Sequence, residues 1–378
     1  MARNNPFSPT FGTSPPALAG RDEILEDLDE AYETGPMHPD FTVLFIGVRG
    51  AGKTAMLNAA EDIVREQGWL VITEQASPDG LIERLTNRAV TLLAGFAGES
   101  RRRVGSVQAA GFGVSFEPRA TTEHPPDLRA ALTELGDRLG EAGSGVLITI
   151  DELHAADLGE VREFGAILQH VTRREGRPVA FAGAALPYIE DDLLEGRAAT
   201  FLQRCSRYDI GLLDAAATRH ALKVPMDRSS AAIEAGALDR AVEASNGYAF
   251  MVQLVGFYTW KAAHDPSAGI SDAEVADGID RAERRIGRLV IAPTWNDLSN
   301  TDRRFLAAMT ADTGGSSLAA IAQRMGVSTS YAHVYRRRLE RAGMIATSDR
   351  NIVRFAYPTA KAWVTSKAAE LSLQQPAP

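Results

Sequence analysis

Short apolar runs alternate with longer amphipathic segments over the first 212 residues of the chain. Between the runs, apolar residues recur at helical spacing in 57–64, 128–139 and 161–171, and a first helix is expected from near Arg21 to the Gly35-Pro36 stop. Alternation of this kind predicts an α/β fold, a parallel sheet with helices on both faces. The five runs of strand length are 41–46, 70–73, 146–150, 179–182 and 208–212.

Other segments depart from this rhythm and suggest the domain organisation. Residues 98–126 carry three consecutive arginines, many glycines and the pair Pro125-Pro126, which indicates an inserted hairpin or loop. Helical segments dominate from 214 to about 289, and Pro293 and Trp295 mark a further boundary. We therefore expect an extended N-terminal segment (1–19), an α/β core (20–213), a helical region (214–292), a compact C-terminal module (293–365) and a tail (366–378).

Composition narrows the class of protein. The 378 residues are 45% hydrophobic and 24% charged, which is typical of a globular protein with two to three domains. The single Cys205 excludes an internal disulfide framework and a cysteine-rich zinc site, and it fits a reducing compartment. Residues 1–19 lack an apolar signal region, and no run reaches membrane-spanning length, so a soluble cytoplasmic protein is expected.

The first apolar run leads into the strongest motif of the chain. Residues 47–54 read Gly-Val-Arg-Gly-Ala-Gly-Lys-Thr, the full G-x-x-x-x-G-K-[ST] pattern between a predicted strand and a predicted helix. Its glycines let the loop curl with backbone N–H groups aimed at phosphate oxygens, and the helix N-terminus adds partial positive charge. Lys53 can neutralise the β and γ phosphates of ATP, while Thr54 can coordinate Mg²⁺. The residues expected to hold the nucleotide here are Gly47, Val48, Arg49, Gly50, Ala51, Gly52, Lys53, Thr54 and Ala55.

A second acidic motif follows the apolar run 146–150. Asp151 is expected to hold Mg²⁺, mostly through water, and Glu152 to activate the attacking water as general base. The alternative is a strand that ends in charged surface residues. Next to the phosphate-binding loop, the adjacent carboxylates favour ATP hydrolysis to ADP and phosphate.

With these motifs the chain resembles AAA+ P-loop ATPases of the origin-recognition and STAND-related types, over about residues 19–360. The resemblance implies an AAA+ core, a helical lid at 214–292 and a C-terminal winged helix. It also places Gly20 and Arg21 near the adenine, although they could equally be a helix-start residue and a solvated arginine. Arg204, before the fifth strand, would be the arginine finger of a homo-oligomer, with Arg197 and Arg207 as competitors and an ordinary surface arginine as the other explanation.

Two departures from this family pattern concern turnover. The fourth predicted strand ends Ala182-Gly183-Ala184-Ala185, without the polar side chain that contacts the γ-phosphate in these families. Residues 245–250 lack the second-sensor arginine of origin-recognition ATPases and look more like the Gly-x-Pro segment of STAND proteins, with Ala249 in place of proline. Both gaps predict slow turnover and a nucleotide-controlled switch.

The C-terminal module has the pattern of a helix-turn-helix. A helix over 317–325, a turn at 326–328 and a second helix over 329–341 are followed by a predicted β-wing at 344–355. Ala332, Tyr335 and Leu339 are expected to pack inward. Residues 297–360 hold nine arginines against five acidic residues, a net charge of +4 within a chain of −9. The expected contacts to double-stranded DNA are Ser328, Thr329, Ser330, His333, Arg336, Arg337 and Arg350.

Two functions follow from these patterns. The first is an ATP-dependent DNA-binding AAA+ protein whose nucleotide state sets the position of the lid and of the winged helix. The second is a STAND-like signalling switch whose winged helix packs on the ATPase core or on a partner protein. The acidic overall charge and the 247–249 segment favour the second function, and the basic second helix favours the first.

Overall fold

The computed structural model describes residues 4–10, 12–102, 127–189, 202–348, 352–357 and 359–373. Five strands form one parallel sheet in the order β2-β3-β4-β1-β5. β4 therefore lies between β1 and β3, and the loops that follow β1 and β3 meet at one edge of the sheet. The strands are β1 (Thr42–Ile46), β2 (Leu70–Gln75), β3 (Val146–Asp151), β4 (Val179–Ala185) and β5 (Ser206–Asp209).

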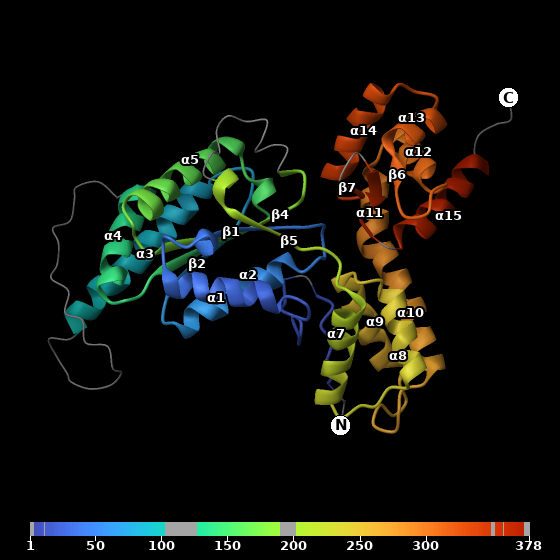
Figure 1. The fold of residues 1–378 in the computed structure, drawn as a ribbon, viewed down its shortest axis with the longest axis horizontal. Coiled ribbons are helices and arrows are strands. Elements are labelled where there is room, and N and C mark those ends of the chain that lie inside the picture. Colours follow the sequence, from blue (N-terminus) through green and yellow to red (C-terminus); the bar gives the residue numbers. More distant parts are fainter. Residues whose placement is uncertain are drawn as a thin grey trace.

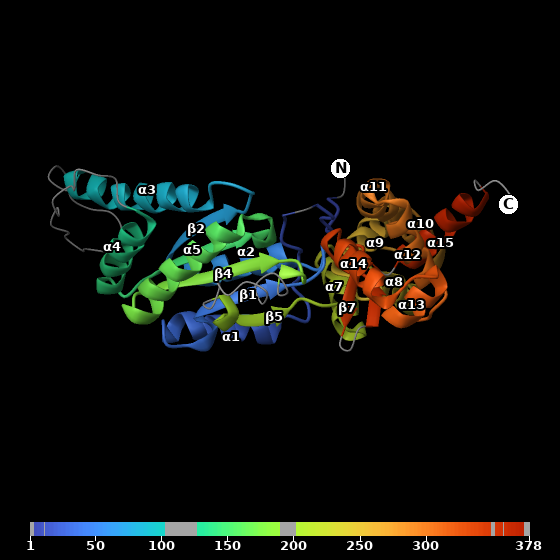
Figure 2. The same ribbon diagram turned by 90° about the horizontal axis from the view of Figure 1, so that it is seen from above.

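Helices cover both faces of the sheet, as the sequence predicts (Figures 1 and 2). Val43 and Phe45 of β1 pack with α1 (Asp22–Thr34) and α2 (Lys53–Glu66) on one face. Leu44 and Ile46 share a core with α3 (Leu81–Arg102), α4 (Leu128–Glu141) and α5 (Leu158–Leu168) on the other face. Every residue of β1 is buried, so this strand holds the loop that follows it in a fixed place.

Two predicted boundaries in the core are wrong. The fifth strand runs over Ser206–Asp209, and its pairing with β1 ends at Asp209, whereas the apolar run 208–212 had suggested a later position. The inserted segment expected at 98–126 overlaps a helix, because α3 continues through Arg102. The rest of that predicted hairpin or loop, 103–126, lies outside the described residues.

A helical unit follows the sheet and lies beside it in Figure 1. Its helices are α7 (Ala215–Arg228), α8 (Ala235–Ser245), α9 (Ala249–Ala262) and α10 (Asp272–Ile286). Asp214 caps α7 by accepting from the N–H of Ala217. α9 is apolar on nearly all sides and forms the centre of this unit, which is named the lid below because it occupies the position predicted for one.

The C-terminal module begins without a break in the helix. α10 continues through a π-helical turn, Gly287–Ile291, into α11 (Ala292–Asp297), so Pro293 and Trp295 lie inside a helix and not in a linker. Trp295 is buried edge-on against Trp363, with 5.3 Å between ring centroids. Trp363 belongs to α15 (Ala360–Leu373), which corrects the expected tail at 366–378: residues 366–373 are helical.

The remaining elements of the module follow the predicted order. After α12 (Asn300–Met309) come β6 (Ser316–Ser317), α13 (Leu318–Met325), a turn with Gly326 in the left-handed conformation, and α14 (Thr329–Arg341). β7 (Ile345–Ser348) and β8 (Ile352–Phe355) then form an antiparallel sheet with β6, in the order β6-β8-β7. No described helix of the chain has the length and apolar character needed to cross a membrane.

Candidate functional site: a phosphate-binding loop beside two carboxylates

The loop after β1 has the curled form that its glycines allow. Gly50 and Gly52 both have positive φ, +73° and +105°, which most other residues adopt only at a cost in strain. Gly52 is the N-cap of α2, so Lys53 and Thr54 are the first residues of that helix. The loop therefore presents backbone N–H groups and a helix N-terminus at one point, which is the arrangement that binds phosphate.

Lys53 is folded back onto this loop. Its ammonium group donates hydrogen bonds to the carbonyl oxygens of Gly47 (2.9 Å) and Val48 (3.0 Å), and the residue is only 5% exposed. Burial lowers the pKa of Lys53, while the negative charges of Glu152 and Asp151 oppose that shift. A buried ammonium with only carbonyl partners is well placed to exchange them for phosphate oxygens.

Thr54 and Asp151 lie next to each other across the two motifs. The Thr54 hydroxyl donates to Asp151 Oδ2 over 2.6 Å, and Asp151 Oδ1 accepts the N–H of Glu152 over 2.7 Å. The sheet order explains this meeting, because β1 and β3 flank β4 and end at the same edge. The hydroxyl and carboxylate oxygens match the hard ligands that Mg²⁺ prefers.

Glu152 has an unusual backbone. Its φ of +51° places a non-glycine residue in the left-handed region, a strain that is often found at functional sites. The hydrogen bond from His154 lowers the pKa of the Glu152 carboxyl, and the nearby charges of Lys53 and Arg49 add to this shift. Glu152 is therefore an ionised carboxylate in the field of the phosphate-binding loop.

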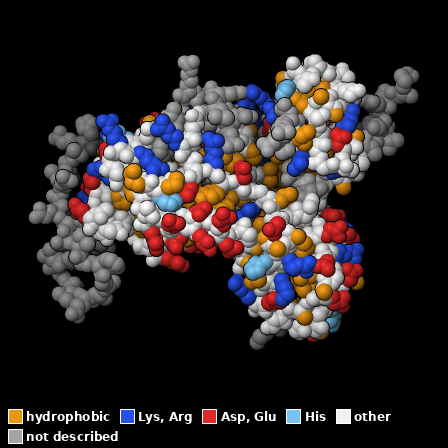
Figure 3. All heavy atoms as spheres, viewed as in Figure 1, with side chains coloured by type: hydrophobic (Ala, Val, Ile, Leu, Met, Phe, Trp, Pro, Cys, Tyr) orange, Lys and Arg blue, Asp and Glu red, His pale blue; other side chains and the backbone are white. Residues whose placement is uncertain are grey.

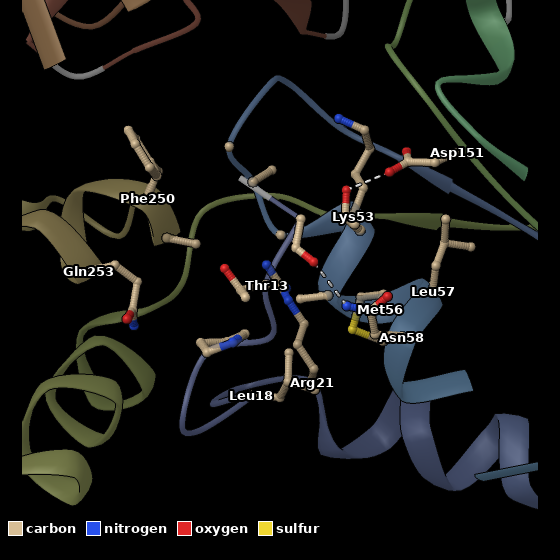
Figure 4. Close-up of a pocket in the computed structure, with 18 of the residues that line it drawn as sticks. Thr13, Leu18, Arg21, Lys53, Met56, Leu57, Asn58, Asp151, Phe250 and Gln253 are labelled. Carbon is tan, nitrogen blue, oxygen red and sulfur yellow. Dashed lines mark hydrogen bonds between the residues drawn. The ribbon is translucent and has the colours of Figure 1, made fainter. Parts of the chain in front are cut away.

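These groups line one cavity of about 730 Å³. In Figure 4, Lys53 and Asp151 lie at one end, and Phe250 and Gln253 of α9 form the opposite wall. Of the residues predicted to hold a nucleotide or metal, the cavity wall includes Arg21, the stretch 49–55, Asp151 and Glu152, while Gly20, Gly47 and Val48 lie outside its lining. The cavity is large enough for a nucleotide whose phosphates lie at the Lys53 end.

The lid contributes contacts that the sequence did not predict. The Phe250 N–H donates to the Gly50 carbonyl over 3.1 Å, and the Tyr248 hydroxyl donates to the Arg49 carbonyl over 2.8 Å. Both residues follow Asn246 and Gly247, which have positive φ and turn the chain between α8 and α9. The only sequence signal was the family segment at 245–250, which pointed to the lid but not to these bonds.

The N-terminal segment is also part of the site, although the sequence suggested only an extended lead-in. Phe7 is 3% exposed and packs against Gly256 of α9, and the Ser8 N–H donates to Gln253 Oε1 over 3.2 Å. Further along, Asn58 of α2 donates to Ser14 Oγ over 3.1 Å. The segment thus joins the lid to the core along one wall of the cavity.

Three residues implied by the family resemblance have distinct surroundings. Arg21 lines the cavity and donates to the Gly211 carbonyl over 2.6 Å, and burial lowers its pKa. Gly20 instead packs against α7, where an added Cβ would lie 2.7 Å from that of Ala217. Arg204 is exposed in a short 3-10 turn before β5 and lies outside the cavity lining. Its role as an arginine finger remains a prediction.

The predicted DNA contacts of α14 divide into groups. Ser328, Thr329, Ser330 and Arg337 are exposed, and His333 is half-buried. Arg336 differs from the expectation: its side chain is only 14% exposed, and its guanidinium bonds to Glu340 and to Thr347 of β7, each over 3.1 Å. Arg336 therefore supports the packing of α14 on β7 and does not face outward. Arg350 lies outside the described residues.

The opposite end of α14 faces the core. Arg341 places its guanidinium 5.9 Å from the ring centroid of Tyr188, which follows β4. Tyr357 of the module packs against Tyr248 of the lid, with 5.7 Å between ring centroids. A second cavity of about 500 Å³ between core and module is lined by Arg49, Arg338 and Arg341, among others.

Comparison with known proteins agrees with this geometry. The fold and the site are of the P-loop type that is found in AAA+ ATPases. Residues 17–182 match the family model of the AAA ATPase domain. Residues 288–364 match a second family, described as Domain of unknown function (DUF8462), and no curated protein sequence matches the chain.

Solved structures share the fold over nearly the whole length. The Walker-type ATPase Paby2304 of Pyrococcus abyssi superposes with a TM-score of 0.64 at 15% identity, covering 92% of this chain and 96% of that one. The Aeropyrum pernix ORC2 protein, in ADPNP-ADP complexes, gives 0.57 at 12% identity, covering 97% and 98%. The arrangement of core and helical C-terminal region is therefore one that both of these solved structures share.

Proposed function

We propose that this protein binds MgATP in the 730 Å³ cavity and hydrolyses it slowly. The observation that carries the proposal is the meeting of Lys53, Thr54, Asp151 and Glu152 at one end of that cavity, within a matched AAA ATPase domain. The Aeropyrum pernix ORC2 protein, which shares the fold, has been solved in ADPNP-ADP complexes. ATP is thus the ligand that both the site chemistry and a structural neighbour favour.

Magnesium fits the same place. Among the described residues, no cluster of three or more His, Cys, Asp or Glu side chains could hold a metal ion by itself. Thr54 and Asp151 would therefore share Mg²⁺ with phosphate oxygens and water, which is the usual manner in which Mg²⁺ binds in nucleotide sites. The bound ion would supply neutralisation of charge on the β and γ phosphates.

The chain's own residues then account for turnover. Lys53 would leave the Gly47 and Val48 carbonyls and bind the phosphates, and Glu152 would accept a proton from the attacking water. The end of β4, Gly183-Ala184-Ala185, is buried and carries no polar side chain to contact the γ-phosphate. This gap supports the expectation of slow turnover.

Two substitutions test the ATPase proposal. Lys53→Ala should abolish the heat of MgATP binding in titration calorimetry, since it removes the ammonium that faces the phosphates. Glu152→Gln should keep MgATP affinity and lower phosphate release at least ~100-fold, because the amide cannot act as a base. A Lys53→Ala protein that binds ATP like the parent, or a Glu152→Gln protein that hydrolyses normally, would overturn the assignment.

We further propose that the C-terminal module is a winged helix that binds duplex DNA. Its order of helices and strands, the exposed residues 328–330 at the start of α14 and its local charge of +4 support this proposal. Acidic side chains gather along the α1 edge of the core in Figure 3, where DNA would be repelled. The basic module offers the more favourable surface for phosphates.

The contacts between module and core favour the second candidate, a STAND-like switch. Arg341 against Tyr188 and Tyr357 against Tyr248 place the module beside the phosphate-binding loop. A nucleotide-dependent change at that loop could therefore release or hold the module. DNA binding and such a switch are compatible, because residues 328–330 stay exposed while the other end of α14 is in contact with the core.

Fluorescence anisotropy with a labelled duplex separates the two candidates. Arg337→Ala together with Arg350→Ala should weaken binding and reduce its salt dependence, and Arg219→Ala, an exposed arginine of α7 paired with Asp239, is the matched control. No duplex affinity at low salt, with or without ATP, would leave the switch as the function of the module. An undiminished affinity in the double variant would remove α14 and the wing from DNA recognition.

A further inference from the structure

The end of β4 lies beside the acidic motif, and a histidine connects them. His154 lies two residues after Glu152 in a short 3-10 turn, Leu153–Ala155, and its side chain is only 5% exposed. Its Nε2 lies 3.1 Å from Glu152 Oε2. On the other side of the ring, the backbone N–H of Leu186, the residue after β4, donates to His154 Nδ1 over 3.3 Å.

These two contacts define the proton position on the imidazole. A backbone N–H can only donate, so Nδ1 must be the unprotonated, accepting nitrogen. The proton of the neutral ring is then on Nε2, where it faces the Glu152 carboxylate and donates to it. His154 is thus a bridge that accepts from the backbone of the β4 end and donates to the proposed general base.

The surroundings hold this bridge in place. The Tyr188 ring packs edge-on against His154, with 5.5 Å between centroids and an interplanar angle of 82°. Arg341 of α14 covers Tyr188 from the other domain. The imidazole therefore has little freedom to rotate, and the carboxylate that it holds lies in the wall of the nucleotide cavity beside the charges of Lys53 and Arg49.

We propose that His154 is a positioning residue for Glu152, which fixes one carboxylate oxygen so that the other can accept the proton of the attacking water. This proposal rests on the proposed ATPase function. The alanine-rich end of β4 has no polar side chain that could contact the reacting groups. The side chain of His154 provides a link instead, because it contacts both the backbone after β4 and Glu152. It touches neither substrate nor metal, so it should affect the rate of the chemical step and not nucleotide affinity.

Steady-state kinetics test this role. His154→Ala should lower kcat roughly 10–100-fold, because a misplaced base loses its alignment with the water, while KM and the Kd for MgATP stay near the parent values. His154→Gln, whose amide N–H can still donate toward Glu152, should recover part of kcat. His170→Ala is the matched control, since His170 also faces a carboxylate, Glu175 at 2.8 Å, but lies outside the cavity lining.

A double variant shows whether His154 acts through Glu152. Glu152→Gln with His154→Ala should turn over no more slowly than Glu152→Gln alone, because the second change removes a group whose target is already inactive. Additive losses would mean that His154 acts elsewhere, and an unchanged kcat in His154→Ala would overturn the proposal while leaving the ATPase function intact.

An NMR measurement tests the His154–Glu152 contact without depending on ATP turnover. Nitrogen-15 NMR of histidine-labelled protein should show one imidazole protonated at Nε2 and not at Nδ1, and that signal should be lost in His154→Ala and shifted in Glu152→Gln. If the chain proves to have no ATPase activity, the proposed function fails and this signal still reports whether the contact exists. A ring protonated at Nδ1 would overturn the proposal even in an active enzyme.

Discussion

The hydroxyl of Tyr248 donates to the carbonyl oxygen of Arg49 over 2.8 Å, so the lid is attached to the tip of the phosphate-binding loop by a side chain. Tyr248 is 1% exposed, and Tyr357 of the C-terminal module covers its ring. Burial strongly raises the pKa of Tyr248, so the phenol stays protonated and donates at any ordinary pH. Three parts of the chain thus meet at one tyrosine beside the proposed phosphate site.

Tyr248→Phe removes this bond and little else. We expect MgATP affinity to fall about 5-fold, because a single hydrogen bond contributes about 1 kcal/mol and the loop loses a support for its bound shape. Titration calorimetry measures the change, and Tyr258→Phe, in the helix α9 that Tyr248 precedes as N-cap, is the control. An affinity equal to that of the parent would show that the loop keeps its shape without the lid.

Gly50→Ala tests the close approach of the Tyr248 hydroxyl to the phosphate-binding loop by a change in the loop itself. A Cβ at this position would lie 2.2 Å from the Tyr248 hydroxyl, and φ is +73°. We expect MgATP affinity to fall ~10-fold or more, because both the loop and the tyrosine must move. Gly68→Ala is a matched control with φ +79° and open space around its Cβ, so it carries the backbone strain, about 1 kcal/mol, without the collision. Equal effects of the two variants on nucleotide binding would contradict the collision.

Cys205 should resist thiol reagents in the folded protein. Burial raises its pKa to about 12, so the reactive thiolate is scarce until the pH approaches that value or the chain unfolds. Labelling with a chromogenic disulfide at pH 8 should therefore be slow in buffer and fast in denaturant. Rapid labelling of the native protein would show that the segment before β5 opens readily.

Two adjacent arginines of α14 should differ in their roles: Arg338 should contribute to the stability of the module and Arg337 to duplex affinity. Arg338 and Arg337 are both exposed, but Arg338 bonds over 2.8 Å to Asp302, whose side chain is 1% exposed and also caps α12 through Ser299. Arg338→Ala should lower the free energy of unfolding of the module by about 1–3 kcal/mol, because a buried carboxylate loses a charged partner.

Urea denaturation followed by tryptophan fluorescence measures the free energy of unfolding of the module, since Trp295 and Trp363 pack together there. Arg337→Ala should leave stability unchanged within about 0.5 kcal/mol and should reduce duplex affinity instead. If both variants unfold at the same urea concentration as the parent, the Arg338–Asp302 bond contributes nothing.

Sequence pattern predicted the parts of the site that are local in the chain. The 47–54 loop and the Asp151-Glu152 pair each follow an apolar strand, and parallel strands end at one edge of a sheet, so their meeting could be inferred. β5 was misplaced because Ser206–Asp209 is an edge strand with polar, half-exposed positions, and an apolar run is typical only of buried strands.

Contacts between segments that are far apart in the chain could not be predicted from the local sequence pattern. Tyr248 bonds to Arg49 across 199 positions of sequence, and Asn5 bonds to Phe257 across 252. The residues around each of these positions do not indicate which distant residue it contacts. Arg336 is different, because it lies four residues after Ala332 and three before Leu339, both buried. Helical spacing could have placed it on the inner face of α14 before the structure did.

The unbroken helical run from α10 through the π-turn into α11 has a mechanical consequence. The lid and the C-terminal module share this run, so it can act as a lever arm: a small rotation of the lid at the nucleotide would appear as a larger sweep of α14 at the far end. The π-turn at Gly287–Ile291, packed against Trp363, is where the arm can bend, and its stiffness would determine how much of that sweep reaches a bound partner.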